Sequence, residues 1–251
     1  MSHFKHRMTS GYSLFELLAV IIIVGIIASV SMRTLRNTVD VSKTEETRQE
    51  MDQLAWAICG NPDLVSGGVR TDFGYVGDVG ALPATLENLV TNPGGYSTWD
   101  GPYIQDDFYA ASGGAESEFK YDAWGVEYTY TGDSIISTGG GTSITREITY
   151  ATTDLLSNVV QALITDLNNT PPGSSCGDVD LQLIYPNGTG SVDTATTHPA
   201  GNGLAAFSSV PVGHHLLNVI YTTTEDTLFR KVVVYPKDSF YTEISFSQDY
   251  W

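Results

Sequence analysis

The residue with the most unusual setting in this chain is an acid, Glu16, near the start of a long apolar run. The run extends from Tyr12 to Met32, and residues 17–28 include no polar side chain. A helix of this length is about enough to cross the hydrocarbon of a bilayer. A carboxylate there is costly unless it has a partner. The presence of Glu16 in this run therefore needs an explanation.

The two cysteines, Cys59 and Cys176, are the next candidates for chemistry. They form no C-x-x-C pair, so neither a zinc site nor a thioredoxin-like motif is supported. In an oxidising compartment they could form one disulfide. Two separate thiols are the alternative, because residues so far apart in sequence carry no information on their geometry.

Patterns typical of catalytic sites are missing from the sequence. There is no G-x-S-x-G, P-loop or H-E-x-x-H motif. The segment Gly201–Ala206 fits G-x-G-x-x-A, but it follows His198-Pro199-Ala200 and not a strand, so it does not indicate a dinucleotide site. His214 and His215 begin a predicted strand, where neighbouring side chains point to opposite faces. We therefore predict that the protein is not an enzyme; an activity with an unrecognised site is a remaining alternative.

The composition narrows the class of protein further. The chain has 251 residues, 41% hydrophobic and 16% charged, with a formal net charge of −17. Strand and turn formers dominate after about residue 70, which favours a β-rich exported protein. A surface of one negative sign argues against nucleic acid as a partner.

The first residues allow three interpretations. The leader from Met1 to Gly11 carries Lys5 and Arg7 and no acid, so the positive-inside rule keeps it in the cytoplasm. The apolar run could be a secretory signal cut near residues 28–31, or a plain single-span anchor. Neither of these interpretations explains Glu16.

The third interpretation rests on the block GYSLFELLAVIIIVGIIA, which begins at Gly11. It resembles the N-terminus of the type IV pilin and pseudopilin family, in which a basic leader ends in Gly and Glu is the fifth mature residue. Tyr12 stands where the family usually has Phe. The resemblance implies that a prepilin peptidase cuts between Gly11 and Tyr12 and methylates the new amino group of Tyr12. Glu16 would then pair with the Tyr12 ammonium of a neighbouring subunit, since both charges gain from pairing in lipid.

The helix is predicted to continue beyond the membrane. Residues 33–59 include no Gly or Pro, and Arg48 and Asp52 are spaced for an i,i+4 contact. Cys59-Gly60-Asn61-Pro62 is a strong stop signal. We therefore predict a leader at 1–11, a transmembrane helix at 12–32 and its periplasmic part at 33–59. Apolar residues recur there at roughly helical spacing, at Leu35, Val39, Met51, Leu54, Ala55 and Ile58.

Residues 60–150 are predicted to form a pseudopilin-like α/β head. The patches Trp99–Tyr103 and Asp122–Tyr128 read W-D-G-P-Y and D-A-W-G-V-E-Y. They resemble patches of the major pseudopilin of type II secretion. A Trp and Tyr cluster also suits the packing of a small sheet, and both interpretations can hold together.

The same resemblance implies calcium binding in the following loop, Gly132–Gly141. Glycines stand here where the family tends to have aspartates, and Asp122 and Asp133 are the acids that remain. Calcium needs several oxygens and usually more than one carboxylate. We therefore expect no metal and no other cofactor.

Residues 151–251 are predicted to form an added β-sandwich. Short segments rich in β-branched and aromatic residues alternate with turns such as Asn168–Gly173 and Pro186–Gly188. This spacing suits a small antiparallel sandwich. The patch Phe207–His214 resembles a turn of the carboxypeptidase-regulatory-like sandwich.

Together these features predict an α+β fold: a long N-terminal helix packed on a small antiparallel sheet, followed by a β-sandwich. The expected function is a structural subunit of a type II secretion pseudopilus or a type IV pilus-like filament. It would be a single-pass protein of a bacterial inner membrane, with its C-terminal domains in the periplasm. The expected partners are prepilin peptidase, other pilin-like subunits, an inner-membrane assembly platform and a secreted protein substrate. The alternative is a monomeric membrane-anchored periplasmic binding protein that uses the β-sandwich.

Overall fold

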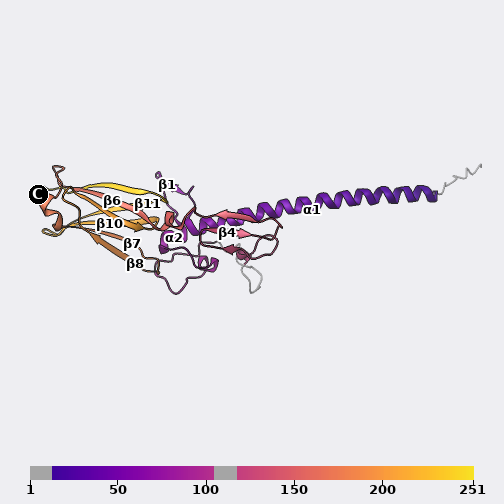
Figure 1. Ribbon diagram of the computed structural model, residues 1–251, viewed down its shortest axis with the longest axis horizontal. Helices are drawn as coiled ribbons and strands as arrows, with labels where there is room; N and C mark the ends of the chain where they lie inside the picture. Colours follow the sequence, from indigo (N-terminus) through magenta and orange to yellow (C-terminus); the bar gives the residue numbers. More distant parts are fainter. Residues whose placement is uncertain (1–12, 105–117) are drawn as a thin grey trace, which may run out of the picture. The chain divides into compact units, whose positions relative to one another are not determined.

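The computed structural model describes residues 13–104 and 118–251. Contacts divide the chain into two units, Met1–Glu46 and Thr47–Trp251. The predicted α+β class is confirmed, because one long helix is followed by small sheets and a strand-rich C-terminal region (Figure 1). The predicted division of the head at residue 150 stays a prediction.

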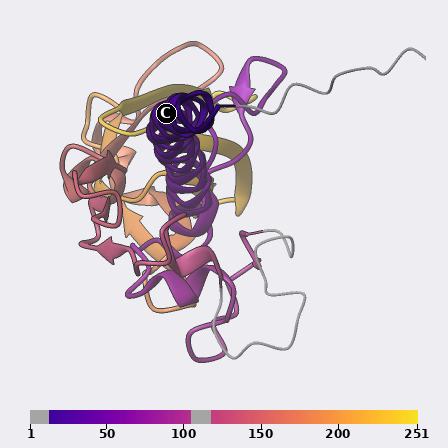
Figure 2. The same cartoon turned by 90° about the vertical axis from the view of Figure 1, so that its right-hand side faces the viewer.

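The first element is the helix α1, Leu14–Cys59, which Figure 2 shows nearly end-on as one unbroken coil. Its first half is rich in Leu, Ile, Val and Ala and has no Pro, and its large apolar side chains are exposed. The hydroxyls of Ser29, Thr34 and Thr38 donate to carbonyls of the preceding turn. Polar side chains that lie along the helix are thus satisfied by its own backbone.

The second half of α1 becomes buried from Thr47 onward. Leu35 and Val39, which the apolar spacing placed in the same stripe, are 64% and 50% exposed. Both residues lie in α1, as the spacing predicts, but the buried positions of the helix begin only at Thr47. The buried residues are Thr47, Met51, Leu54, Ala55, Ala57 and Ile58.

Helix α1 ends at Cys59, at the stop signal Cys59-Gly60-Asn61-Pro62 that the sequence indicated. Gly60 adopts a left-handed φ of 81°, and its N–H donates to Trp56 O at 2.7 Å. A side chain at Gly60 would run into the Asp72 backbone. The guanidinium of Arg70 donates to Cys59 O at 2.6 Å, so a cation caps the last turn.

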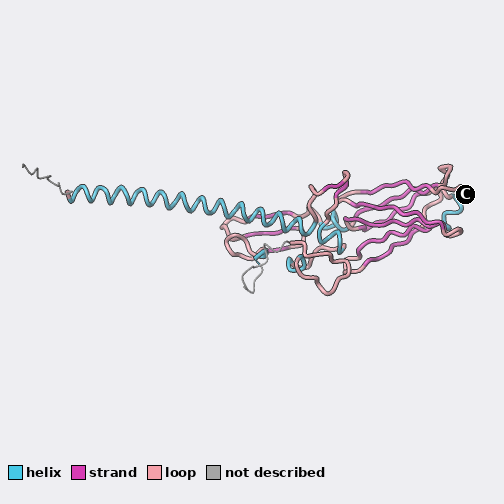
Figure 3. The backbone as a smooth tube through the Cα atoms, turned by 180° about the vertical axis from the view of Figure 1, so that it is seen from behind, coloured by secondary structure: helices cyan, strands magenta, loops and turns pink. Residues whose placement is uncertain are grey.

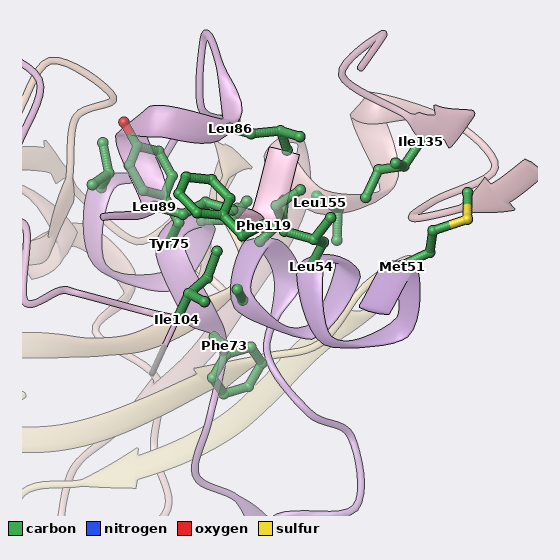
Figure 4. Packing of buried hydrophobic residues seen from close by; sticks show 14 of the residues in the cluster. Met51, Leu54, Phe73, Tyr75, Leu86, Leu89, Ile104, Phe119, Ile135 and Leu155 are labelled. Atoms are coloured by element: carbon green, nitrogen blue, oxygen red, sulfur yellow. The ribbon is translucent and has the colours of Figure 1, made fainter. Parts of the chain in front are cut away.

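The first hydrophobic cluster of the second unit surrounds this end of α1 (Figure 4). Met51 and Leu54 from α1 pack there with Tyr75 and Leu89 from the following segments. Val212, from the turn before β10, belongs to the same cluster. The elements around it are β1 (Val65–Ser66), β2 (Val69–Arg70), α2 (Gly74–Val79), η1 (Leu86–Leu89), η3 (Glu118–Lys120), β3 (Thr129–Tyr130), β4 (Ser134–Ser137), β5 (Ile144–Glu147) and α3 (Thr152–Leu156). The strands β3, β4 and β5 form an antiparallel sheet in that order.

The remaining strands form two sheets over a second hydrophobic cluster, and Figure 3 shows them in magenta. The sheet orders are β11-β10-β7-β8 and β12-β6-β9. Burial alternates along β6 and β10, as expected when one face covers a core. The strands are β6 (Asn158–Thr165), β7 (Val179–Pro186), β8 (Val192–Thr197), β9 (Leu204–Val210), β10 (Gly213–Tyr221), β11 (Asp226–Val234) and β12 (Ser239–Ser245), with η4 (Gly173–Asp178) before β7.

One pairing differs from the antiparallel sandwich that the sequence suggested. β12 pairs with β6 in parallel, with Ser239 opposite Val159 and Ser245 opposite Thr165. Strands so far apart in sequence have no hairpin turn to impose an antiparallel direction.

Candidate assembly site

Glu16 lies in the first turn of α1, among exposed apolar side chains. Its neighbours Phe15 and Leu17 are 79% and 58% exposed. The helix dipole favours an acid at this end. In the described ranges 13–104 and 118–251, no hydrogen bond or ion pair reaches the Glu16 carboxylate. The helix therefore presents a carboxylate that its own described residues leave without a partner.

Gly11 and Tyr12, the predicted processing site, lie outside the described residues. Cleavage after Gly11 and methylation of Tyr12 therefore stay predictions. Among the described helices, α1 is long and apolar enough to cross a membrane, judged by length and composition alone.

The patch at Trp99–Tyr103 packs the head. Trp99 Nε1 donates to Asn88 O at 2.9 Å, and its ring meets Tyr103 edge-on with 5.7 Å between centroids. The Tyr103 hydroxyl donates to Asp78 Oδ2 at 3.0 Å, and burial raises the pKa of Tyr103, which keeps the hydroxyl protonated. Tyr75 completes the stack at 5.7 Å. The aromatic residues thus form a wall of the first hydrophobic cluster, as the packing interpretation expects.

The Asp122 carboxylate is the centre of a compact cluster of hydrogen bonds. Asp122 Oδ1 accepts the backbone N–H groups of Trp124 at 3.0 Å and Val126 at 2.9 Å. Its Oδ2 accepts Ser137 Oγ at 2.6 Å and the N–H of Gly139 at 3.0 Å. Asp122 and Ser137 are 4% and 0% exposed. This one carboxylate therefore joins the turn at 122–126 to the end of β4 and the turn that follows β4.

The hydrogen bonds around Asp122 favour the ionised form of its carboxylate. Burial raises the pKa of the carboxyl, but the hydrogen bonds from Ser137 and from the N–H groups of Val126, Gly139 and Trp124 outweigh it. The net effect is a pKa below the usual value for aspartate.

Asp133, the second acid that the sequence offered as a calcium ligand, lies at the opposite end of β4. Its Oδ1 accepts the Thr131 hydroxyl at 2.7 Å and the Ser134 hydroxyl at 3.2 Å. About 10 Å of extended strand separates Ser134 from Ser137. In the described part of the chain, no group of three or more His, Cys, Asp or Glu side chains could share a metal ion.

The structure shows Cys59 and Cys176 as free thiols, and whether they can form a disulfide stays a prediction. Cys59 Sγ donates to Ala55 O at 3.2 Å at the end of α1, whereas Cys176 lies in η4 beside the start of β7. Burial raises the pKa of the Cys59 thiol, which favours its neutral form.

The histidine pair points to opposite faces of β10, as the strand period predicts. His214 packs edge-on against Phe73 at 5.3 Å, while His215 Nε2 lies 2.7 Å from Pro211 O. Burial lowers the pKa of both imidazoles.

Three residues that hold the head together were missed in the sequence. Thr47 Oγ1 accepts the N–H of Ala123 at 3.2 Å, and Arg70 caps α1. Arg146 on β5 lies 2.7 Å from Asp52, which the sequence had paired with Arg48. Each of these contacts joins segments far apart in sequence, so no local pattern indicates them.

In the described residues, an exposed apolar helix carries an acid in its first turn, and a small antiparallel sheet packs near the end of that helix, an arrangement that resembles pilin-like proteins. The chain is 29% identical over 152 residues to the type II secretion system core protein G of Xanthomonas campestris pv. campestris. The match covers 56% of this chain and 89% of that protein. It confirms the resemblance to the type II secretion pseudopilins that the N-terminal block and the head patches indicated.

The other comparisons add no argument. No protein-family model matches the chain. A 9R-lipoxygenase from Cyanothece PCC8801 matches 45% of this chain at 12% identity, with a TM-score of 0.20. This chain spans only 18% of the lipoxygenase, and a likeness this small says nothing about fold or function.

Proposed function

We propose that this protein is a structural subunit of a type II secretion pseudopilus. The observation that carries the proposal is Glu16, an acid in an exposed apolar helix to which none of the residues in 13–104 and 118–251 offers a partner. Similarity to a core protein of type II secretion supports the same conclusion. The function is mechanical and interactive, not enzymatic.

Assembly follows from the charges at the start of the helix. A prepilin peptidase cuts after Gly11, and the new ammonium at Tyr12 lies in a layer of low dielectric. Glu16 of one subunit then pairs with the Tyr12 ammonium of the next, because either charge alone in lipid is costly. The pair sets the register of the incoming subunit.

The proposed partners follow from this assembly. They are prepilin peptidase, other pilin-like subunits and an inner-membrane assembly platform. The strand-rich region beyond residue 151 offers an additional surface to a secreted protein or a neighbouring subunit. In this proposal α1 anchors the protein in a bacterial inner membrane, with the head in the periplasm.

Mass spectrometry of the protein recovered from membranes tests the processing step. The expected mature chain begins at N-methylated Tyr12, and Gly11→Val should keep the leader attached, because a β-branched side chain obstructs the cut. A mature chain that begins near Met32 would indicate a secretory signal and overturn the proposal.

A further inference from the structure

We propose that the Asp122 carboxylate takes the place of a calcium ion in this protein, locking the loop after β4 without any metal. Calcium in this loop is what the resemblance to the major pseudopilin implies. The side chains present do not fit such a site, and three features of this region explain why.

The first feature is the saturation of the Asp122 carboxylate. An ionised carboxylate has two oxygens with about four acceptor positions. Four donors occupy them here, two on each oxygen, at 2.6–3.0 Å. A calcium ion at either oxygen would have to displace the Ser137 hydroxyl or a backbone N–H, and would leave that donor buried and unpaired.

The second feature is the glycine at position 139. A Cβ built on Gly139 would lie 2.5 and 2.7 Å from the two Asp122 oxygens and 2.7 Å from Trp124 Cβ. The neighbouring Gly140 has the Trp124 ring at 2.9 Å from its built Cβ. The carboxylate and the indole therefore fill the space that a side chain at these positions would need. Glycine at 139 and Asp122 are two parts of one arrangement.

The third feature is the separation of the acids. Asp133 lies before β4, whereas Ser137 and Gly139 lie at its end. Asp122 and Asp133 therefore cannot converge on one cation while β4 is extended. The turn is closed instead by hydrogen bonds from its own backbone to Asp122, in the way that buried carboxylates satisfy clustered N–H groups.

Thermal unfolding of the full-length protein in detergent micelles tests this inference. Melting should occur at the same temperature in excess chelator and in calcium. A site filled at a hundred times its Kd would raise the Tm by about 5–10 °C. Asp122→Asn should lower the Tm by about 5–10 °C, because its amide NH₂ would face a donor. The matched control, Asp133→Asn, should change it by less than about 2 °C.

A local measurement separates locking of the loop from general stability. Amide hydrogen exchange of the peptide that covers residues 132–141 should be slow in wild type and unchanged by calcium. Ser137→Ala, which removes one hydroxyl donor and keeps the fold, should speed exchange in this peptide and leave the peptides of β10 unchanged. A Tm that rises with calcium in wild type but not in Asp133→Asn would overturn the proposal. Unchanged exchange in Ser137→Ala would also overturn it.

Discussion

Glu16 and Asp122 are two carboxylates with opposite surroundings. Glu16 lies on the exposed apolar half of α1, and the described residues offer it no donor. Asp122 is buried in the head, where four donors of the same chain surround it. A carboxylate is costly in apolar surroundings in both places, so each needs a partner. The chain itself supplies the donors of Asp122, whereas for Glu16 we propose that the partner comes from another subunit.

The largest expected effect is on assembly. Glu16→Ala should leave processing and membrane level unchanged, because the acid is not needed for insertion. It should abolish filaments, since breaking one partner of a buried pair costs about 3–5 kcal/mol at each subunit. The measurement is recovery of the protein in sheared or cross-linked filaments.

The matched control for this change is Glu46→Ala, an exposed acid of the same helix beyond the apolar run. It should assemble as wild type does. If Glu16→Ala also enters filaments normally, the docking role is wrong and the monomeric anchored binding protein becomes the better account.

Replacing an isoleucine with alanine should change the free energy of unfolding by different amounts in the two halves of α1. Ile58 is 0% exposed in the first hydrophobic cluster, whereas Ile26 is 59% exposed. Ile58→Ala should lower the free energy of unfolding by about 2–5 kcal/mol, because it leaves a cavity. Ile26→Ala should change it by less than about 0.5 kcal/mol. Denaturant unfolding of the full chain in micelles measures both, and equal effects would contradict the division of the helix.

Acid should remove the stabilisation that Asp122 supplies. Its folded-state pKa lies below the unfolded value of about 4, so the contribution is full above that value and is lost as the pH falls through the folded-state pKa. The Tm difference between wild type and Asp122→Asn should therefore shrink as the pH is lowered from about 6 to about 3.

The two histidines with lowered pKa values do not disturb this comparison. His214 and His215 have lowered pKa values and also destabilise the fold in acid, but they do so equally in both variants. A Tm difference that stays constant with pH would show that the Asp122 charge contributes nothing.

The smallest expected effect concerns Asp52 and Arg146, which are both 42% exposed. A double-mutant cycle with Asp52→Asn and Arg146→Ala should give a coupling of about 0.2–1 kcal/mol, typical of exposed ion pairs. The cycle of Asp52→Asn with Arg48→Ala is the control and should give none. A coupling energy between Asp52 and Arg48 instead would show that Asp52 pairs within α1, at i,i+4 spacing, and not with Arg146.

Local signals in the sequence were sufficient for the helix and its acid. The end of α1 at Cys59 follows from the adjacent Gly60, Asn61 and Pro62, and Glu16 was recognised from a block of contiguous residues. Interactions between distant segments were not accessible in this way. Asp52 pairs with Arg146 because β5 passes beside α1, and no spacing along the helix encodes that neighbour.

The same limit applies to the sandwich and to the calcium loop. The parallel pairing of β12 with β6 depends on the order in which strands fill two sheets. The scarcity of acids at residues 132–141 was the reason to expect no calcium there, but it did not indicate which contacts hold the turn after β4. Those contacts come from Ser137 and Gly139, which only the fold brings beside Asp122.

The central claim is that Glu16 pairs with the amine of another subunit, and isotope-mixed cross-linking tests it most directly. Filaments assembled from a mixture of unlabelled and ¹⁵N-labelled protein would be treated with a lipid-soluble carbodiimide, which joins a carboxylate to an amine. We predict a cross-linked pair of peptides, Tyr12 of one chain to Glu16 of the other, with hybrid isotope mass, and its absence in Glu16→Gln. Cross-links confined to single-isotope masses, or none in intact filaments, would contradict the account.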